Sequence, residues 1–310
     1  MIRHLITAAF LGSALLHAQT PPPPPPPEEG GGTDGGGRSF DLSKIPVPEE
    51  DKKAAEPELS AEERQGIPIM LSVVPVGYVP PPIIKIGKDG MPREEYRHPL
   101  EYPPVVYHVK TKKGSIRVMG PQNQIGPATR IPRTSRISLS YEMPPGEEAV
   151  SDDAGPRLRM IGEFGVERDT THLVVVLWKD PDSVRWTSPK LKVIDASPAK
   201  MKRNEVVVVN ASGRDLAVHR GDKPYQIRPG FMGRLEMAVD GEGRIPLVVA
   251  APNGPEWAQL SKTVIGPRSD ERVFVVAWRT PKSPAQPSGV SVNAASKRMT
   301  TPEPFAKSKS

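Results

Sequence analysis

The residue types that perform most enzyme chemistry are sparse in this chain and poorly spaced for it. Beyond the first twenty residues the histidines are His98, His108, His172 and His219, and cysteine is absent. No two of these histidines have the short spacing of a zinc motif such as H-E-x-x-H. We therefore predict no metal site and no cofactor, and the lack of cysteine excludes a thiol nucleophile and any disulfide.

A serine–histidine–aspartate triad could be assembled from Asp169, His172 and either Ser183 or Ser188. The chain has no G-x-S-x-G motif, and no strand–turn–helix pattern surrounds these serines to expose a nucleophile. Serine and aspartate also occur in turns because their side chains bond to nearby backbone. We predict no catalytic residue and a protein that binds instead of catalysing.

Basic side chains are the stronger candidates for ligand binding, and they gather in two places. The first group is Lys110, Lys112, Lys113 and Arg117, and the second is Lys200, Lys202 and Arg203. Each group lies beside a predicted strand, so its cations can face one polyanion. The formal net charge of +6 favours such partners. We expect an anionic polymer of a cell envelope or another envelope protein as the partner.

Tryptophan offers a second kind of contact. Trp186 and Trp257 lie outside the most apolar segments, and their indoles are candidates for stacking on a carbohydrate. Aromatic residues make up only 5% of the chain, and no motif for stacking nucleobases is present. We therefore predict no nucleic-acid partner.

The body that positions these groups is β-rich, and its clearest element occurs twice. Residues 171–181 read THLVVVLWKDP, and residues 271–281 read ERVFVVAWRTP. Runs of β-branched apolar residues favour an extended backbone. Both faces of residues 173–178 are apolar, so we expect the outer face to be covered by a partner domain or another chain.

Other short strands separated by glycine and proline fill the rest of the body. We match residues 103–110 with 205–210, residues 83–86 with 189–194, residues 115–118 with 214–218 and residues 136–139 with 234–237. We place residues 67–79 at a sheet edge or crossing because of Pro68 and Pro75. A turn at 210–213 should place Gly213 at positive φ. The fold class predicted is all-β, with two tandem immunoglobulin-like antiparallel β-sandwich domains formed by internal duplication, residues 67–182 and 183–281.

The flanking segments predict an extracytoplasmic location. Residues 1–18 have the basic start, apolar stretch and small-residue end of a signal peptide. Residues 19–66 are predicted to be a Pro/Gly-rich acidic disordered linker, and residues 282–310 a disordered basic tail. No segment has the roughly 20 apolar residues of a transmembrane helix. The mature protein is expected in the periplasm, on the cell surface or released.

The function predicted is that of a non-enzymatic binding or structural protein, an envelope-associated adaptor or assembly subunit. A carbohydrate- or cell-wall-binding module is the first alternative. A periplasmic chaperone-like protein that offers a strand edge is the second, and a hydrolase with an interdomain site is the third. A homo-oligomer is compatible with each of them.

Overall fold

The structure is a computed structural model, and it describes residues 66–305 except 96, 144–156, 181, 221–222 and 285. The regular structure of these residues is β-strand, apart from one 3-10 turn, η2 (Pro99–Glu101). The predicted signal peptide and the linker up to residue 65 lie outside the described residues. Within the described ranges, no helix is long and apolar enough to cross a membrane.

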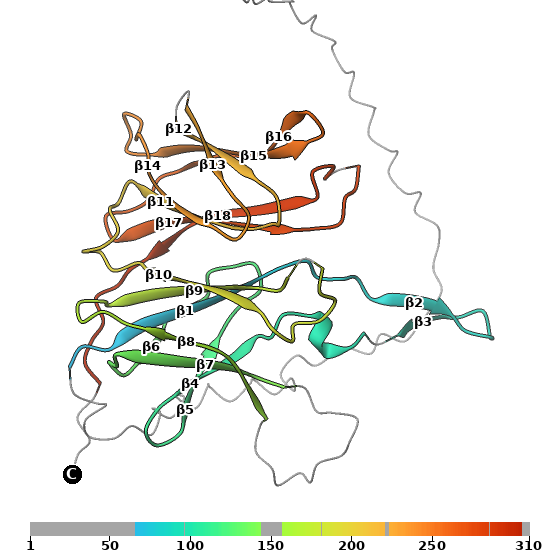
Figure 1. The fold of residues 1–310 in the computed structure, drawn as a ribbon, viewed down its shortest axis with the longest axis horizontal. Helices are drawn as coiled ribbons and strands as arrows, with labels where there is room; N and C mark the ends of the chain where they lie inside the picture. The colour runs from blue at the N-terminus through green and yellow to red at the C-terminus, as the bar shows by residue number, and fades with distance from the viewer. Residues whose placement is uncertain are drawn as a thin grey trace, which may run out of the picture. The chain divides into compact units, whose positions relative to one another are not determined.

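The first half of the body forms two four-stranded sheets and a separate hairpin. Sheet I has the order β10 (Lys190–Asp195), β9 (His172–Trp178), β1 (Ile69–Val76) and β6 (Thr129–Ile131). Sheet II has the order β5 (Ser115–Met119), β4 (Val106–Lys110), β7 (Arg136–Glu142) and β8 (Leu158–Gly165). Strands β2 (Ile83–Ile86) and β3 (Pro92–Glu95) form the hairpin, which projects from the sheets in Figure 1.

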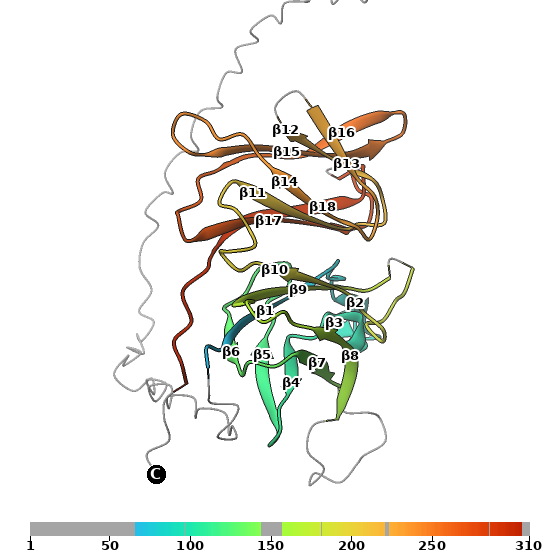
Figure 2. The same ribbon diagram turned by 60° about the vertical axis from the view of Figure 1, so that its left-hand side comes forward.

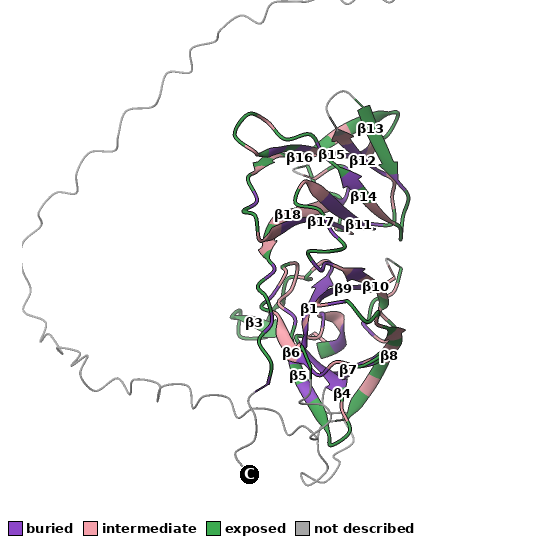
Figure 3. Ribbon diagram, turned by 90° about the vertical axis from the view of Figure 1, so that its left-hand side faces the viewer, coloured by how far each residue is buried: buried purple, intermediate pink, exposed green. Residues whose placement is uncertain are grey.

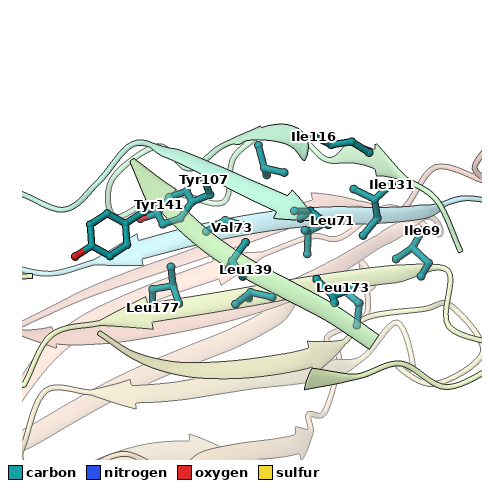
Figure 4. Close-up of a cluster of buried hydrophobic side chains, with 14 of the residues drawn as sticks. Ile69, Leu71, Val73, Tyr107, Ile116, Ile131, Leu139, Tyr141, Leu173 and Leu177 are labelled. Atoms are coloured by element: carbon teal, nitrogen blue, oxygen red, sulfur yellow. The ribbon is translucent and has the colours of Figure 1, made fainter. Parts of the chain in front are cut away.

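Side chains from sheets I and II meet in one core. Strand β7 alternates between exposed and buried residues, so Ile137, Leu139 and Tyr141 all point inward. They share a core with Leu71 and Leu173 of sheet I, among others, and Figure 4 shows Leu139 near these two leucines. This period-two pattern buries one face of the sheet and leaves the other in water.

The second half forms two further four-stranded sheets. Sheet III has the order β14 (Met232–Glu236), β11 (Glu205–Ala211), β17 (Glu271–Arg279) and β18 (Val290–Arg298). Sheet IV has the order β13 (Lys223–Ile227), β12 (Leu216–Arg220), β15 (Ile245–Asn253) and β16 (Glu256–Ile265). Residues of both sheets, including Val208, Val218 and Val249, share a buried core.

The pairing pattern of sheets I and II recurs in sheets III and IV. The two central strands of sheets I and III run parallel, β1 with β9 and β11 with β17. A register irregularity interrupts β7–β8 and also β15–β16. The prediction of purely antiparallel sheets is therefore wrong for the two central pairs, while the other pairs are antiparallel.

Of the segment matches made from sequence, only that of residues 171–181 with 271–281 agrees with the strand pairing. Residues 103–110 contain β4, which pairs antiparallel with β5 and β7, whereas β11 pairs parallel with β17. Residues 83–86 form the hairpin strand β2, whereas β10 pairs with β9. Short runs of valine and isoleucine look alike in any strand, so they carry no information on the partner strand.

Strand β9 is buried on both faces, as its composition predicts. Leu173, Val175 and Leu177 belong to the core between sheets I and II. Val174, Val176 and Trp178 face the other way and pack in a second core with residues of sheet III. The outer face is thus covered by the second half of the same chain, and Figures 2 and 3 show β9 as an inner, buried strand.

Strand β1 is central, not at a sheet edge as its prolines suggested. Strand β6 pairs only with Ile69–Leu71, so β1 has no strand on that side at Pro75. The carbonyl of Pro75 accepts a hydrogen bond from the Asn123 amide, 2.8 Å away. The N and C=O of one strand residue point to the same side. The N–H that Pro75 lacks would therefore face the loop that contains Asn123. The pairing of β1 with β9, on the other side, stays intact.

The predicted disordered tail and the predicted domain boundary both need correction. Residues 290–298 form β18, which pairs along its length with β17, and Phe305 is buried in the core between sheets I and II. Strand β10 pairs with β9, so residues 190–195 belong to sheet I and not to a second domain starting at residue 183. The polar, alanine-rich composition of β18 hid a strand whose order comes from its pairing with β17.

Candidate anion-binding groove

The first predicted basic group lies on the hairpin formed by β4 and β5. The turn closes with a hydrogen bond from the Thr111 amide to the Gly114 carbonyl, 2.9 Å long. Val109 and Ile116 point into the core, so their strand neighbours point outward. All four basic residues are exposed, and the segment 106–119 contains no acidic residue. We call these four residues the basic hairpin.

Part of the basic hairpin lines a hollow of about 370 Å³. We call this hollow the hairpin groove. Its lining residues are Val109, Lys110, Thr111, Lys112, Pro132, Arg133, Thr134, Arg136 and Ser138. Four of them are basic, and none of the described lining residues is acidic. Lys113 and Arg117 belong to the same hairpin but do not line the groove.

Arg133 and Arg136 are the groove residues that the sequence did not single out. Arg133 is anchored by hydrogen bonds to the carbonyls of Ile67 at 3.0 Å and Thr170 at 2.8 Å, and also to that of Arg168. Arg136 pairs with Glu163 at 3.1 Å. Carbonyl acceptors leave the charge of Arg133 uncompensated, so it contributes to a positive field in the groove. Its only signal in the sequence is the basic pair flanking Thr134-Ser135.

The second predicted basic group is already engaged by neighbouring groups. Lys200 lies 2.6 Å from Glu167 and 3.1 Å from Asp169, and hydrogen bonds to these carboxylates raise the pKa of its ammonium. Lys202 pairs with Glu236 at 3.1 Å. Arg203 donates twice to the Pro267 carbonyl, at 3.0 and 2.7 Å. The charges of Lys200 and Lys202 are therefore partly compensated by carboxylates.

The prediction for Trp186 as a surface binder is wrong. Its side chain is fully buried in the core between sheets I and II. Its amide donates to the Leu100 carbonyl at 2.7 Å, and its carbonyl accepts from the Tyr141 hydroxyl at 2.9 Å. Trp257 is 48% exposed near the β15–β16 turn, opposite Pro252. Only Trp257 of this pair can meet a ligand.

The histidines bond to separate partners. His98 Nδ1 accepts from the Leu100 amide at 3.1 Å, and His108 Nε2 lies 2.7 Å from Glu142. His172 Nε2 donates to the Thr300 carbonyl at 2.8 Å. Asp169, the acid of the triad considered above, pairs with Lys200. Across the described residues, no group of three or more histidines and carboxylates is arranged to hold a metal ion.

Comparison with known proteins supplies no family. No family model matches the chain, and no curated protein matches it.

Proposed function

We propose that this protein is a non-enzymatic binding protein of the cell envelope that holds an anionic polymer or an acidic envelope protein in the hairpin groove. In this proposal residues 1–18 direct the chain out of the cytoplasm. The two halves are tandem immunoglobulin-like domains that arose by duplication. The recurrent strand pairing of the halves supports the duplication, as does the match of Val76 with Trp178 and of Ala211 with Trp278 in the parallel pairs.

The observation that carries the proposal is the gathering of Lys110, Lys112, Arg133 and Arg136 around one groove with no acidic lining residue. Arg133 is held in place by backbone carbonyls before any ligand arrives. A cation fixed in advance loses little conformational entropy on binding. The lysines add mobile charges on an exposed turn, which suits a flexible polyanion.

The test is binding of fluorescein-labelled dextran sulfate to the full chain, measured by anisotropy over a salt series. The variant K110E/K112E should weaken binding by roughly tenfold or more at low salt, where screening is weak. Its matched control is K88E/K262E, which makes the same charge change at two exposed lysines outside the groove. An equal loss in both variants would reduce the effect to net charge and overturn the assignment of the groove.

A carbohydrate-binding function is the second candidate, and the exposure of Trp257 favours it. An indole that is about half exposed on a hairpin can stack on the flat face of a sugar. W257A should abolish retention on insoluble cell-wall polysaccharide if this surface binds it. Retention equal to that of the wild type would remove the candidate.

A further inference from the structure

A second hollow lies where the two parallel strand pairs end. Val76 of β1 is opposite Trp178 of β9, and Ala211 of β11 is opposite Trp278 of β17. All four residues line one hollow of about 400 Å³, which we call the tryptophan groove. Its other lining residues are Gly77, Tyr78, Lys179, Arg214, Arg279, Thr280, Pro281, Lys282 and Gly289.

The tryptophan groove is separate from the hairpin groove. Arg133 of the hairpin groove bonds to Ile67, just before β1, whereas Val76 and Gly77 of the tryptophan groove lie where β1 ends. Eight strand residues at about 3.3 Å each span roughly 25 Å. A ligand of the size that fills one groove therefore does not reach the other.

The indoles form an apolar floor for this groove. Trp178 belongs to the core between sheets I and III, and Trp278 packs against that core while remaining partly exposed. The floor is therefore supported by packed side chains of both halves. Such support holds the exposed part of Trp278 in one position, as a stacking surface requires.

The charged residues of the groove lining are all cationic. Four basic residues line the groove, and no described lining residue is acidic. Arg279 pairs with Asp182 at 3.2 Å, an aspartate whose side chain is 89% exposed. Lys179 Nζ donates to the Val184 carbonyl at 2.8 Å, a neutral acceptor. No partner for the side chains of Arg214 and Lys282 is found among the described residues, so both are available to a ligand.

We propose that the tryptophan groove binds an acidic sugar, a pyranose that carries a carboxylate. The C–H face of the ring would lie on Trp278, and the carboxylate would accept hydrogen bonds from Arg214 and Lys282. Charge-assisted bonds of this kind are stronger than neutral ones, and arginine can bind a carboxylate through two N–H groups. A neutral sugar would leave the cations without partners. A wholly apolar ligand would also have to remove them from water.

The geometry favours a sugar over a nucleobase. Trp178 is only 6% exposed, so just one indole presents a substantial free surface. A base clamped between two rings needs two free faces, whereas a pyranose needs one apolar face and hydrogen-bond partners around its rim. The volume of about 400 Å³ lies in the range of small-molecule sites.

The experiment titrates trigalacturonate into the full-length W257F chain and follows tryptophan fluorescence. The W257F background removes the most exposed indole outside the groove. We expect saturable quenching by trigalacturonate and much weaker binding of the neutral maltotriose. The variant R214Q/K282Q should weaken trigalacturonate binding by roughly tenfold, as expected for lost charge-assisted bonds. W278F, which keeps a ring in the floor, should retain weakened binding and confirm that the fold survives.

Three results would overturn the proposal. Equal affinity for maltotriose and trigalacturonate would show that the carboxylate of the sugar is not recognised. Tighter binding of UMP than of trigalacturonate would indicate a nucleotide site. No binding of trigalacturonate by the folded chain would show that the groove is not a sugar site. With the hairpin variant K110E/K112E, the quenching by trigalacturonate should match that of the W257F chain, because no tryptophan is among the described residues that line the hairpin groove. This outcome separates failure of the tryptophan groove from failure of the hairpin groove.

Discussion

The guanidinium carbon of Arg130 lies 4.8 Å from the centre of the Phe305 ring, an arrangement that joins β6 to the end of the described chain. Arg130 also donates to the carbonyls of Glu303 at 3.0 Å and Pro304 at 2.7 Å. Residues 299–305 follow β18 and return to the first half, as Figure 2 shows. We call them the C-terminal strap. Met299 and Phe305 anchor its ends in two different cores.

Removing the Phe305 ring should destabilise the protein substantially. Its side chain is 6% exposed, and truncation of a buried phenylalanine leaves a cavity that costs ~3 kcal/mol or more. F305A is compared by urea denaturation with F231A, whose phenylalanine is 60% exposed. We expect a clearly lower free energy of unfolding for F305A and little change in it for F231A. Similar midpoints for the two variants would show that the strap adds no stability.

His172 should make folding stability fall as the solution is acidified. A carbonyl can only accept, so Nε2 carries the proton that bonds to Thr300, and Nδ1 accepts from the Thr171 hydroxyl at 3.0 Å. Burial lowers the pKa of His172, although the Thr300 hydrogen bond and Asp195 oppose the shift. The unfolded chain therefore takes up a proton first, near pH 6.5, while the folded chain does so at lower pH. Stability is present above about pH 6.5 and is lost as the pH falls below it.

Thermal unfolding at about pH 7.5 and about pH 5.5 measures this effect. H172Q should narrow the difference between the two melting temperatures, because glutamine has no proton to gain. H219Q is the control for removing an imidazole elsewhere. If the wild type and H172Q lose the same stability on acidification, His172 does not contribute.

The tryptophans outside β9 and β17 should differ sharply in their effect on stability. Trp186 is fully buried, and its Cζ2 atom would lie 3.1 Å from a Cβ placed on Gly77, so the ring fills its space closely. W186A is expected to cost ~3–5 kcal/mol, as for other large core aromatics. W257A should change stability by less than about 0.5 kcal/mol, since surface substitutions usually do. Guanidinium unfolding of both variants measures the difference.

The features that follow from local pattern were predictable from the sequence. The alternation within residues 172–178 gives each face of β9 to a different core. Gly213 has φ 74°, as expected for the turn after Asn210. The basic hairpin was also found, because its cations flank a short turn between two strands. These properties depend on period, turn chemistry and charge, which are all local.

The features that depend on distant partners were not predictable. Nothing near Phe305 indicates that its core lies in the first half of the chain. Arg133, in the connection between β6 and β7, joins the hairpin groove because three carbonyls from distant segments bind it. The tryptophan groove needs the ends of β1 and β11 beside those of β9 and β17, a pairing of distant segments that the sequence did not predict. Trp186 looked like a loop residue, and only the packing of sheets I and II buries it.

The buried guanidinium of Arg272 donates hydrogen bonds to backbone carbonyls instead of pairing with a carboxylate. The residue is 5% exposed, and its Nη1 donates to the carbonyls of Glu271 at 2.8 Å and Ser269 at 3.2 Å. Its Nε donates to the carbonyl of Met201, in the connection between β10 and β11. Arginine therefore holds that connection against β17 in a way that requires several donors on one planar group.

Methionine at position 272 would keep much of the volume but leave these carbonyls without their donor. Met201 is buried, and a buried acceptor left unpaired costs about 1–3 kcal/mol, so R272M should lose at least ~1 kcal/mol of stability. R272K keeps the positive charge, but an ammonium cannot reproduce the planar set of donors of a guanidinium. The stability of R272K should therefore lie between those of R272M and the wild type. R268M changes an exposed arginine four positions earlier and serves as the control. Urea denaturation ranks the four proteins, and an R272K chain as stable as the wild type would show that charge alone suffices.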